Sequence, residues 1–220
     1  MRKLIRGIID FRQNMLAEYR AKFAKLAHGQ SPDTLFIACC DSRVVPNVFA
    51  STDPGDLFVV RNIGNLVPPY VSAKAFDIET AAAVEFSLNQ VGVQNIIICG
   101  HSECAAMQAV LTGYNNPEMP CLNAWLEYGQ PSYQLYQESP IQFAPNLSAT
   151  NQLSQMNVIQ QLEHLKTYPA LTQRLENKQV KIHGWWFDLA TADVHYYNPT
   201  VKQFKLIDSA EAEKAIEEIQ

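Results

Sequence analysis

Two short segments of the chain concentrate the side chains that can carry out chemistry. The first places Cys39, Asp41 and Arg43 at alternate positions, and the second places His101 three residues before Cys104. Each segment follows a short, continuously apolar run, which is the pattern of a buried strand. If the first segment stays extended, its three reactive side chains point to one side. If the two strands are parallel neighbours, both segments meet at the carboxyl edge of the sheet, where ligands bind in open α/β folds.

The side chains of Cys39, His101 and Cys104 form a ligand set that suits tetrahedral zinc, because they offer two thiolates and one imidazole. Three protein ligands leave the fourth position for water, whereas a structural site more usually closes with a fourth Cys or His. Cys40 is poorly placed to chelate beside Cys39 on a strand. Two plainer alternatives remain open: cysteines that are only small buried hydrophobes, and a redox role for the vicinal pair.

The charge of such a centre predicts roles for Asp41 and Arg43. Zn²⁺ with two thiolates and a neutral imidazole has no net charge, so it should acidify water less than a zinc ion held by three His. Asp41 could accept a hydrogen bond from the nucleophile and orient it toward an electrophile. Arg43 would keep that carboxylate ionised through a charge-assisted pair.

The elements that must position these residues follow from the hydrophobic pattern. Apolar residues recur at helical spacing in three segments: 3–27, 73–90 and 151–165. Strand-like runs occupy residues 34–39, 57–61, 95–99, 179–183, 193–197 and 201–207, and a polar helix begins at residue 209. Alternating apolar strands and helices predict an α/β fold with a mostly parallel sheet, flanked by helices and ending in an antiparallel C-terminal edge.

One domain is the expected organisation, because no repeat or long linker divides the 220 residues. We expect an N-terminal helical arm (1–28), a core carrying the zinc site (29–112), an irregular excursion of loops and short helices (113–150), and a C-terminal helix with strands (151–220). Of the cysteines outside the ligand set, Cys40 and Cys99 are expected to pack in the core, and Cys121 has no assigned role.

Composition excludes several classes of protein. With 17 Lys and Arg against 22 Asp and Glu, the net charge is −5, and no basic cluster alternates with aromatic residues, so a nucleic-acid partner is not expected. No apolar run reaches the roughly 20 residues of a membrane span. Arg6 and Asp10 interrupt the start of the chain before a signal-peptide core can form, which predicts a cytoplasmic protein without a membrane partner.

The two motifs, Cys-Cys-Asp-Ser-Arg-Val at residues 39–44 and Gly-His-Ser-Glu-Cys at residues 100–104, together resemble those of the β-class carbonic anhydrases. Similar segments recur at residues 58–62, 66–70, 83–86 and 183–185. The resemblance implies reversible hydration of CO₂ to bicarbonate and a proton by a lyase that uses a zinc-bound hydroxide as nucleophile. It also implies one Zn²⁺ per chain, held by Cys39, His101 and Cys104, with Asp41 and Arg43 as the catalytic dyad.

The resemblance extends to a substrate pocket. Gln30 aligns with a glutamine that donates a hydrogen bond to substrate in plant-like members, and Phe58 and Phe86 align with aromatic pocket walls. In the family this pocket lies at a dimer interface, which implies a homodimer or a dimer of dimers. On its own, the apolar stripe of the N-terminal arm could serve that interface or cover the core of its own chain.

Several positions depart from the family pattern. A bicarbonate-inhibited subset carries Trp, Arg and Tyr where this chain has Phe36, Arg61 and Phe187, so we predict the plant-like subtype without that inhibitory site. Ala105 and Ala106 replace the usual glycine after the last ligand, and this apolar narrowing leaves hydrolysis of CS₂ or COS on the same fold as an alternative. A third alternative is a zinc-stabilised structural or regulatory protein without catalysis.

Overall fold

The fold is described from a computed structural model, for residues 1–70, 78–138 and 141–219. Its strands are β1 (Thr34–Cys39), β2 (Leu57–Asn62), β3 (Asn95–His101), β4 (Lys181–Phe187), β5 (Val194–Asn198) and β6 (Gln203–Leu206). Its helices are α1 (Arg2–Asp10), α2 (Leu16–Leu26), α3 (Pro46–Phe49), α4 (Ile78–Phe86), α5 (Ala105–Thr112), α6 (Pro120–Leu126), α7 (Gln130–Glu138), α8 (Ala149–Leu165), α9 (Pro169–Glu176) and α10 (Ser209–Ile219). None of these helices has the length and apolar character of a membrane span.

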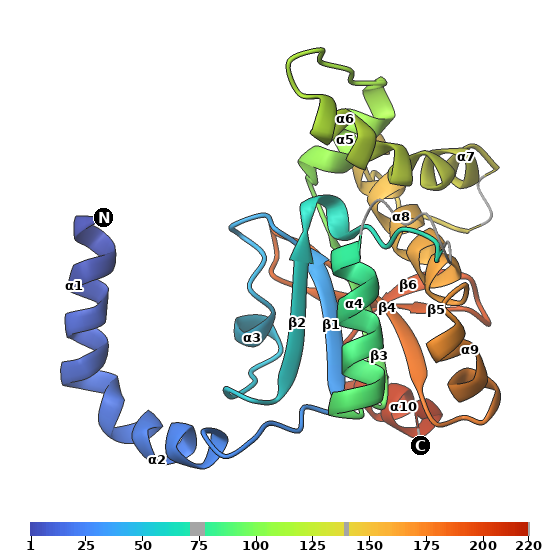
Figure 1. Ribbon diagram of the computed structural model, residues 1–220. Coiled ribbons are helices and arrows are strands. Elements are labelled where there is room, and N and C mark those ends of the chain that lie inside the picture. Colours follow the sequence, from blue (N-terminus) through green and yellow to red (C-terminus); the bar gives the residue numbers. More distant parts are fainter. Residues whose placement is uncertain (71–77, 139–140, 220) are drawn as a thin grey trace.

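The strands form one mixed sheet in the order β2-β1-β3-β4-β5-β6 (Figure 1). The pairs β1 with β2, β1 with β3 and β3 with β4 are parallel, whereas β5 and β6 add an antiparallel edge. This confirms the predicted α/β class and the antiparallel C-terminal edge. Because β1 and β3 are parallel neighbours, their carboxyl ends meet at one edge of the sheet.

One face of the sheet is thickly covered. Side chains from alternate positions of the central strands, such as Leu35, Ile37 and Ile96, are fully buried against α4, α8 and α9. The other face carries a smaller cluster, in which Phe36 and Phe187 pack around Phe49 of α3. The buried core therefore lies mainly on the side of α8.

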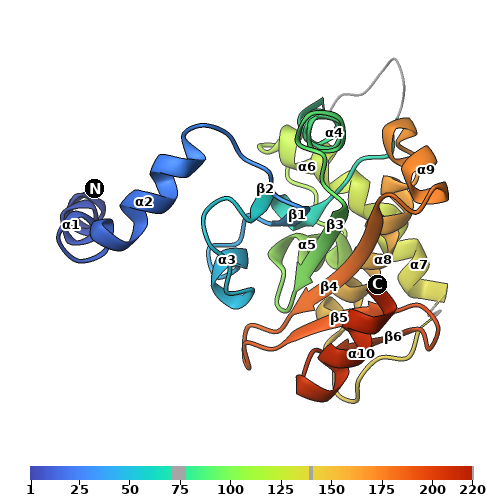
Figure 2. The same ribbon diagram turned by 90° about the horizontal axis from the view of Figure 1, so that it is seen from below.

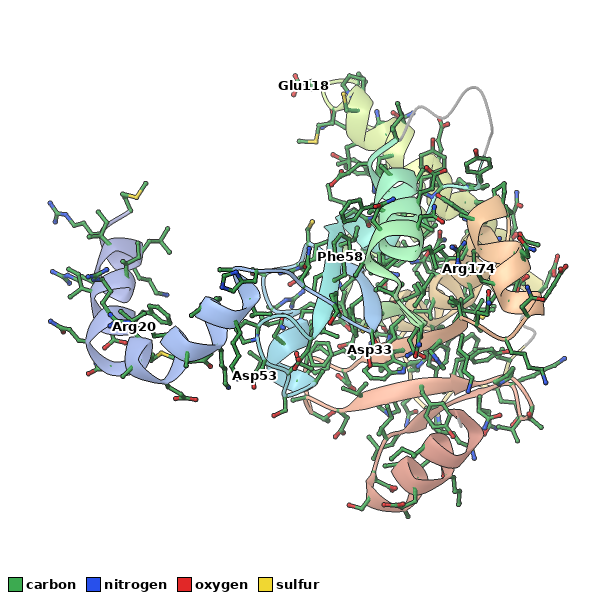
Figure 3. All side chains as sticks on the ribbon, turned by 60° about the horizontal axis from the view of Figure 1, so that its bottom comes forward. Arg20, Asp33, Asp53, Phe58, Glu118 and Arg174 are labelled. Atoms are coloured by element: carbon green, nitrogen blue, oxygen red, sulfur yellow. The ribbon has the colours of Figure 1, made fainter. Side chains whose placement is uncertain are left out.

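The boundaries of several elements differ from those predicted. The predicted strand at residues 179–183 is β4, which continues to Phe187, so Trp185 and Trp186 lie inside the strand rather than beyond it. The helix predicted at 73–90 is observed as α4 and a π-helical turn ending at Val91, and residues 71–77 lie outside the described part. The predicted excursion contains α6 and α7, and Glu118 lies at its tip (Figure 3).

The N-terminal arm extends away from the body of the molecule (Figures 1 and 2). It consists of α1 and α2, joined by a π-helical turn, and contains no buried residue. Large apolar side chains on it are open to solvent, with Leu4 66% and Ile8 61% exposed. The arm therefore does not cover the core of its own chain.

Candidate metal centre

The carboxyl edge of the sheet brings together the predicted ligand set. One donor atom from each of Cys39, His101 and Cys104 lies within 4.8 Å of the other two. Cys39 is the last residue of β1, His101 is the last residue of β3, and Cys104 immediately precedes α5. The last two do not share a helical face, because the helix begins only at Ala105; a short turn after β3 brings them together instead.

The imidazole of His101 is prepared for a metal ion. Its Nδ1 lies 2.8 Å from the carbonyl oxygen of Ser102, which can only accept a hydrogen bond, so Nδ1 carries the proton. Its Nε2 is buried and has no hydrogen-bond partner among the described residues. A buried lone pair without a donor is costly, and a cation beside two thiols would satisfy it. The donor set and this nitrogen therefore fit zinc.

The two cysteine thiols interact directly. A hydrogen bond from Cys104, the adjacent His101 ring and the backbone N–H groups of Asp41 and Gly64 lower the pKa of Cys39 to about 4, against the opposing effect of burial. The same bond to Cys39 and burial raise the pKa of Cys104. Without metal the two sulfurs therefore share one proton, which a divalent cation would displace.

Asp41 and Arg43 form a second cluster beside the thiols. The chain turns after β1, so the contact arises from a turn and not from the extended alternation that the sequence suggested. Arg43 holds both carboxylate oxygens of Asp41, through Nε at 2.9 Å and Nη2 at 2.8 Å. These bonds keep the pKa of Asp41 well below its usual range. Arg43 also donates to the carbonyl of Glu103, which ties the pair to the turn that carries Cys104.

Helix α8 supports the turn between His101 and Cys104. Ser154 donates to the carbonyl of His101 at 2.7 Å, and Asn151 accepts from the backbone N–H of Glu103 at 2.7 Å. Gly100 is required before the histidine, because a Cβ there would lie 2.7 Å from a methyl carbon of Val158. Sequence reasoning missed these supporting residues. Their signal was the spacing of polar residues at positions 151, 154, 157 and 161, which places them along one side of the helix.

Arg61 supports the turn after β1. Its guanidinium donates to the carbonyls of Cys39, at 3.0 Å, and Asp41, at 2.6 Å. Cys40, between those two residues, is exposed, so the prediction that it packs in the core is wrong. Cys99 is buried as expected.

The predicted substrate residues lie apart from this cluster within one chain. Phe58 and Phe86 form a ring pair with centroids 5.8 Å apart. Phe58 pairs with Leu35 in the sheet, four residues before Cys39, which corresponds to about 13 Å along the strand. Gln30 is exposed and precedes the amino end of β1, whereas Cys39 closes its carboxyl end. A single chain therefore does not bring these residues to the thiols.

The fold and site define an α/β metalloprotein, with a three-residue metal site at the carboxyl edge of a mostly parallel sheet. The family model described as carbonic anhydrase matches residues 34–194. A carbonic anhydrase from Helicobacter pylori strain J99 is 36% identical over 196 residues, covering 87% of this chain and 88% of the relative. One from Synechocystis sp. is 35% identical, covering 93% and 73%.

Solved structures agree with the sequence relatives. The β-carbonic anhydrase CcaA is 34% identical and superposes with a TM-score of 0.85, covering 95% of this chain and 92% of that one. A tetrameric β-carbonic anhydrase from Sordaria macrospora is 26% identical with a TM-score of 0.76, covering 89% and 95%. This chain belongs to the carbonic anhydrase family, in its β class.

Proposed function

We propose how this β-carbonic anhydrase performs the reversible hydration of CO₂ to bicarbonate and a proton. Cys39, His101 and Cys104 would hold one Zn²⁺ per chain. When bound, zinc acts as a Lewis acid that makes water a nucleophile near neutral pH. The observation that carries the proposal is the buried, unpartnered Nε2 of His101 within 4.8 Å of two thiols.

Asp41 and Arg43 would act on the attacking water. The Asp41 carboxylate, kept ionised by the two bonds from Arg43, accepts a hydrogen bond from that water and orients it toward the carbon of CO₂. The carbonyl tethers from Arg61 and Arg43 hold this carboxylate in place relative to the ligand-bearing turns. The described group of metal donors contains three residues, which supports an open fourth position and argues against a purely structural zinc site.

The substrate pocket would be completed by a second copy of the chain. Gln30, Phe58 and Phe86 lie toward the amino half of the central strands, away from the thiols of their own chain, so a partner would supply them. The exposed apolar arm supports this assembly, as does a groove of about 480 Å³ on the thinly covered face of the sheet, lined by residues that include Ala50, Leu57 and Trp185. A homodimer is the minimum; a dimer of dimers accords with the tetrameric relative.

The remaining sequence predictions concern subtype and location. Phe36 and Phe187 are buried, at 0% and 7% exposure, on the sheet face opposite α8. We propose that no bicarbonate-binding site forms between them, as in the plant-like subtype. The cytoplasmic location stays a prediction.

Stopped-flow hydration of CO₂ by the zinc-loaded protein tests the activity. We expect a rate well above the uncatalysed reaction and no sulfide release from CS₂. A rate equal to the uncatalysed one would overturn the proposal, and sulfide release without CO₂ hydration would identify the CS₂ hydrolase instead.

A further inference from the structure

One peptide unit links the excursion at residues 113–150 to a metal ligand. The N–H of Gly64 donates to Sγ of Cys39 at 3.4 Å. The carbonyl at the other end of the same peptide bond, that of Ile63, accepts from the indole Nε1 of Trp125 at 2.7 Å. Because the peptide is planar, fixing its carbonyl also fixes the direction of its N–H.

We propose that Trp125 is a positioning residue for the metal centre, acting on Cys39 through the Ile63–Gly64 peptide. The proposal rests on the proposed function in taking Cys39 as a metal ligand. In this role Trp125 touches neither substrate nor metal. It sets the strength and direction of the hydrogen bond that the thiolate receives.

The segment that carries this peptide needs external support. Gly64 has φ 78° and Asn65 has φ 45°, so two successive residues occupy the left-handed region that side chains disfavour. Such a conformation persists only when its surroundings hold it. A Cβ on Gly64 would lie 2.9 Å from Cβ of Ala106, so the turn is also packed closely against α5.

Two helices supply that support at consecutive carbonyls. Trp125 of α6 holds the carbonyl of Ile63, and the fully buried Asn157 of α8 donates to the carbonyl of Gly64 at 3.0 Å. Asn157 is itself fixed, because its Oδ1 accepts from Ser132 at 2.9 Å. Trp125 thus holds this turn together with Asn157 and with Asn62, whose side-chain amide bonds both backbone groups of Leu66.

The surroundings of Trp125 suit a rigid contact. Its ring packs against the apolar cluster that contains Cys39, Cys104 and Leu66, and it meets Tyr128 edge-on with centroids 5.6 Å apart. A donor on a packed aromatic ring loses little conformational entropy when it forms its bond. The excursion at residues 113–150 therefore has a function in this proposal: it supplies the indole N–H that binds the Ile63 carbonyl behind the metal site.

The chemical effect follows from the direction of the bonds. A hydrogen bond to the carbonyl polarises the peptide and strengthens its N–H as a donor. An N–H group that donates to sulfur withdraws electron density from the thiolate. It therefore also lowers the electron density at the metal centre, which as a whole has no net charge. Removing a hydrogen-bond partner of a metal ligand typically lowers metal affinity or activity by about 10–100-fold.

The test is Trp125→Phe, which keeps an aromatic ring and removes the N–H. Tyr128→Phe is the matched control, because it removes a polar group from the ring that meets Trp125 and leaves the bond to the Ile63 carbonyl in place. Two measurements do not depend on catalytic activity. One is the zinc affinity, obtained by competition with a chelator, and the other is the thiolate-to-metal charge-transfer band of the Co²⁺-substituted protein. We expect Trp125→Phe to bind zinc about 10-fold more weakly or worse, because the turn no longer holds Cys39 in its ligating orientation. The band should shift to longer wavelength, because the thiolate becomes more electron-rich. Tyr128→Phe should leave both unchanged.

Unchanged affinity and an unchanged band in a folded Trp125→Phe protein would overturn the proposal. If Trp125→Phe does not fold, Trp125 is replaced by benzothienylalanine, in which a sulfur atom takes the place of the indole N–H and the ring shape is kept. The zinc affinity and the charge-transfer band of that protein then test the proposal in the same way. Failure of the proposed function is separable. A wild-type protein that binds zinc but does not hydrate CO₂ would overturn the activity and leave this measurement valid.

Discussion

The carboxyl edge of the sheet and the N-terminal arm differ in what they bury: the edge buries polar donor side chains, whereas the arm leaves large apolar side chains exposed. At the edge, the donor residues Cys39, His101 and Cys104 are 6%, 0% and 0% exposed, and the turns around them are held by hydrogen bonds from α6 and α8. On the arm, no residue is buried and Leu4 is 66% exposed. The first region is complete within one chain.

The contrast between the two regions indicates which part of the molecule would act with a second copy. The ligand set requires only the meeting of β1 and β3, which one chain provides. The apolar stripe of the arm is exposed, and Gln30, Phe58 and Phe86 lie away from the thiols of their own chain, so we propose that both act between two copies. We therefore expect changes at the edge to remove metal and chemistry, and changes on the arm to remove assembly while metal remains.

The largest effect should come from Cys104→Ser, which removes a buried ligand. We expect zinc content to fall from about one per chain to a small fraction and CO₂ hydration to fall to background, because a three-ligand site without one thiolate cannot retain the ion. Metal analysis after dialysis measures this. Cys40→Ser is the matched control, since Cys40 is exposed one residue from a ligand. Equal zinc loss in both variants would contradict the assigned ligand set.

On the arm, Leu4→Ser combined with Ile8→Ser should separate the copies. Burying each side chain contributes about 1.5–3 kcal/mol. We therefore expect the dissociation constant of the dimer to rise by at least about 100-fold. Sedimentation measures the association, and zinc content should stay at the wild-type level. Val201→Ser, at an exposed turn of the body, is the control. If the double variant remains dimeric down to the same protein concentration as the wild type, the arm is not the interface.

Asp41→Asn should lower the hydration rate while zinc remains bound. The amide cannot accept the two bonds from Arg43 as a carboxylate does, and it orients the attacking water less well, so we expect kcat to fall by about 100-fold. Asp53→Asn serves as control, because the carboxylate of Asp53 pairs with Lys22 of the arm. A wild-type rate in Asp41→Asn would remove this residue from the catalytic account.

A smaller effect is expected in the pH dependence of stability, which concerns the body alone. Burial lowers the pKa of His164, His183 and His195 below the ordinary value of 6.5. The unfolded chain therefore takes up these protons first as the pH falls, so stability is complete above about pH 6.5 and declines below it. Urea unfolding between pH 7.5 and 5.5 measures the slope. His164→Gln should flatten it; an unchanged slope would contradict a role for burial at that histidine.

Local pattern sufficed for the central part of the fold. The strand 34–39 is found with its predicted bounds, because a six-residue run of apolar or small residues bounded by Pro32 and a polar cluster is too short for a buried helix and is typical of a buried strand. The meeting of the two motifs also followed from strand order. By contrast, the length of β4 was underestimated, since the aromatic pair Trp185 and Trp186 gives no periodic signal that marks a strand end.

What the sequence could not predict depends on contacts between distant segments. Trp125 and Asn157 reach the 63–65 turn from 62 and 93 residues away in the sequence, and no local pattern specifies such pairings. The exposure of Cys40 depends on the chain turning immediately after β1, where the sequence suggested continued extension. The apolar stripe of the arm fitted either its own core or a partner, and only the structure shows that it leaves its own core uncovered.

Titration of the metal-free protein with Zn²⁺, with CO₂ hydration followed in the same samples, tests the central claim most directly. We predict that the hydration rate rises in proportion to bound zinc and levels off at about one zinc per chain. A protein that binds one zinc per chain while its hydration rate stays at the uncatalysed value would contradict the assignment of this cluster as the catalytic centre.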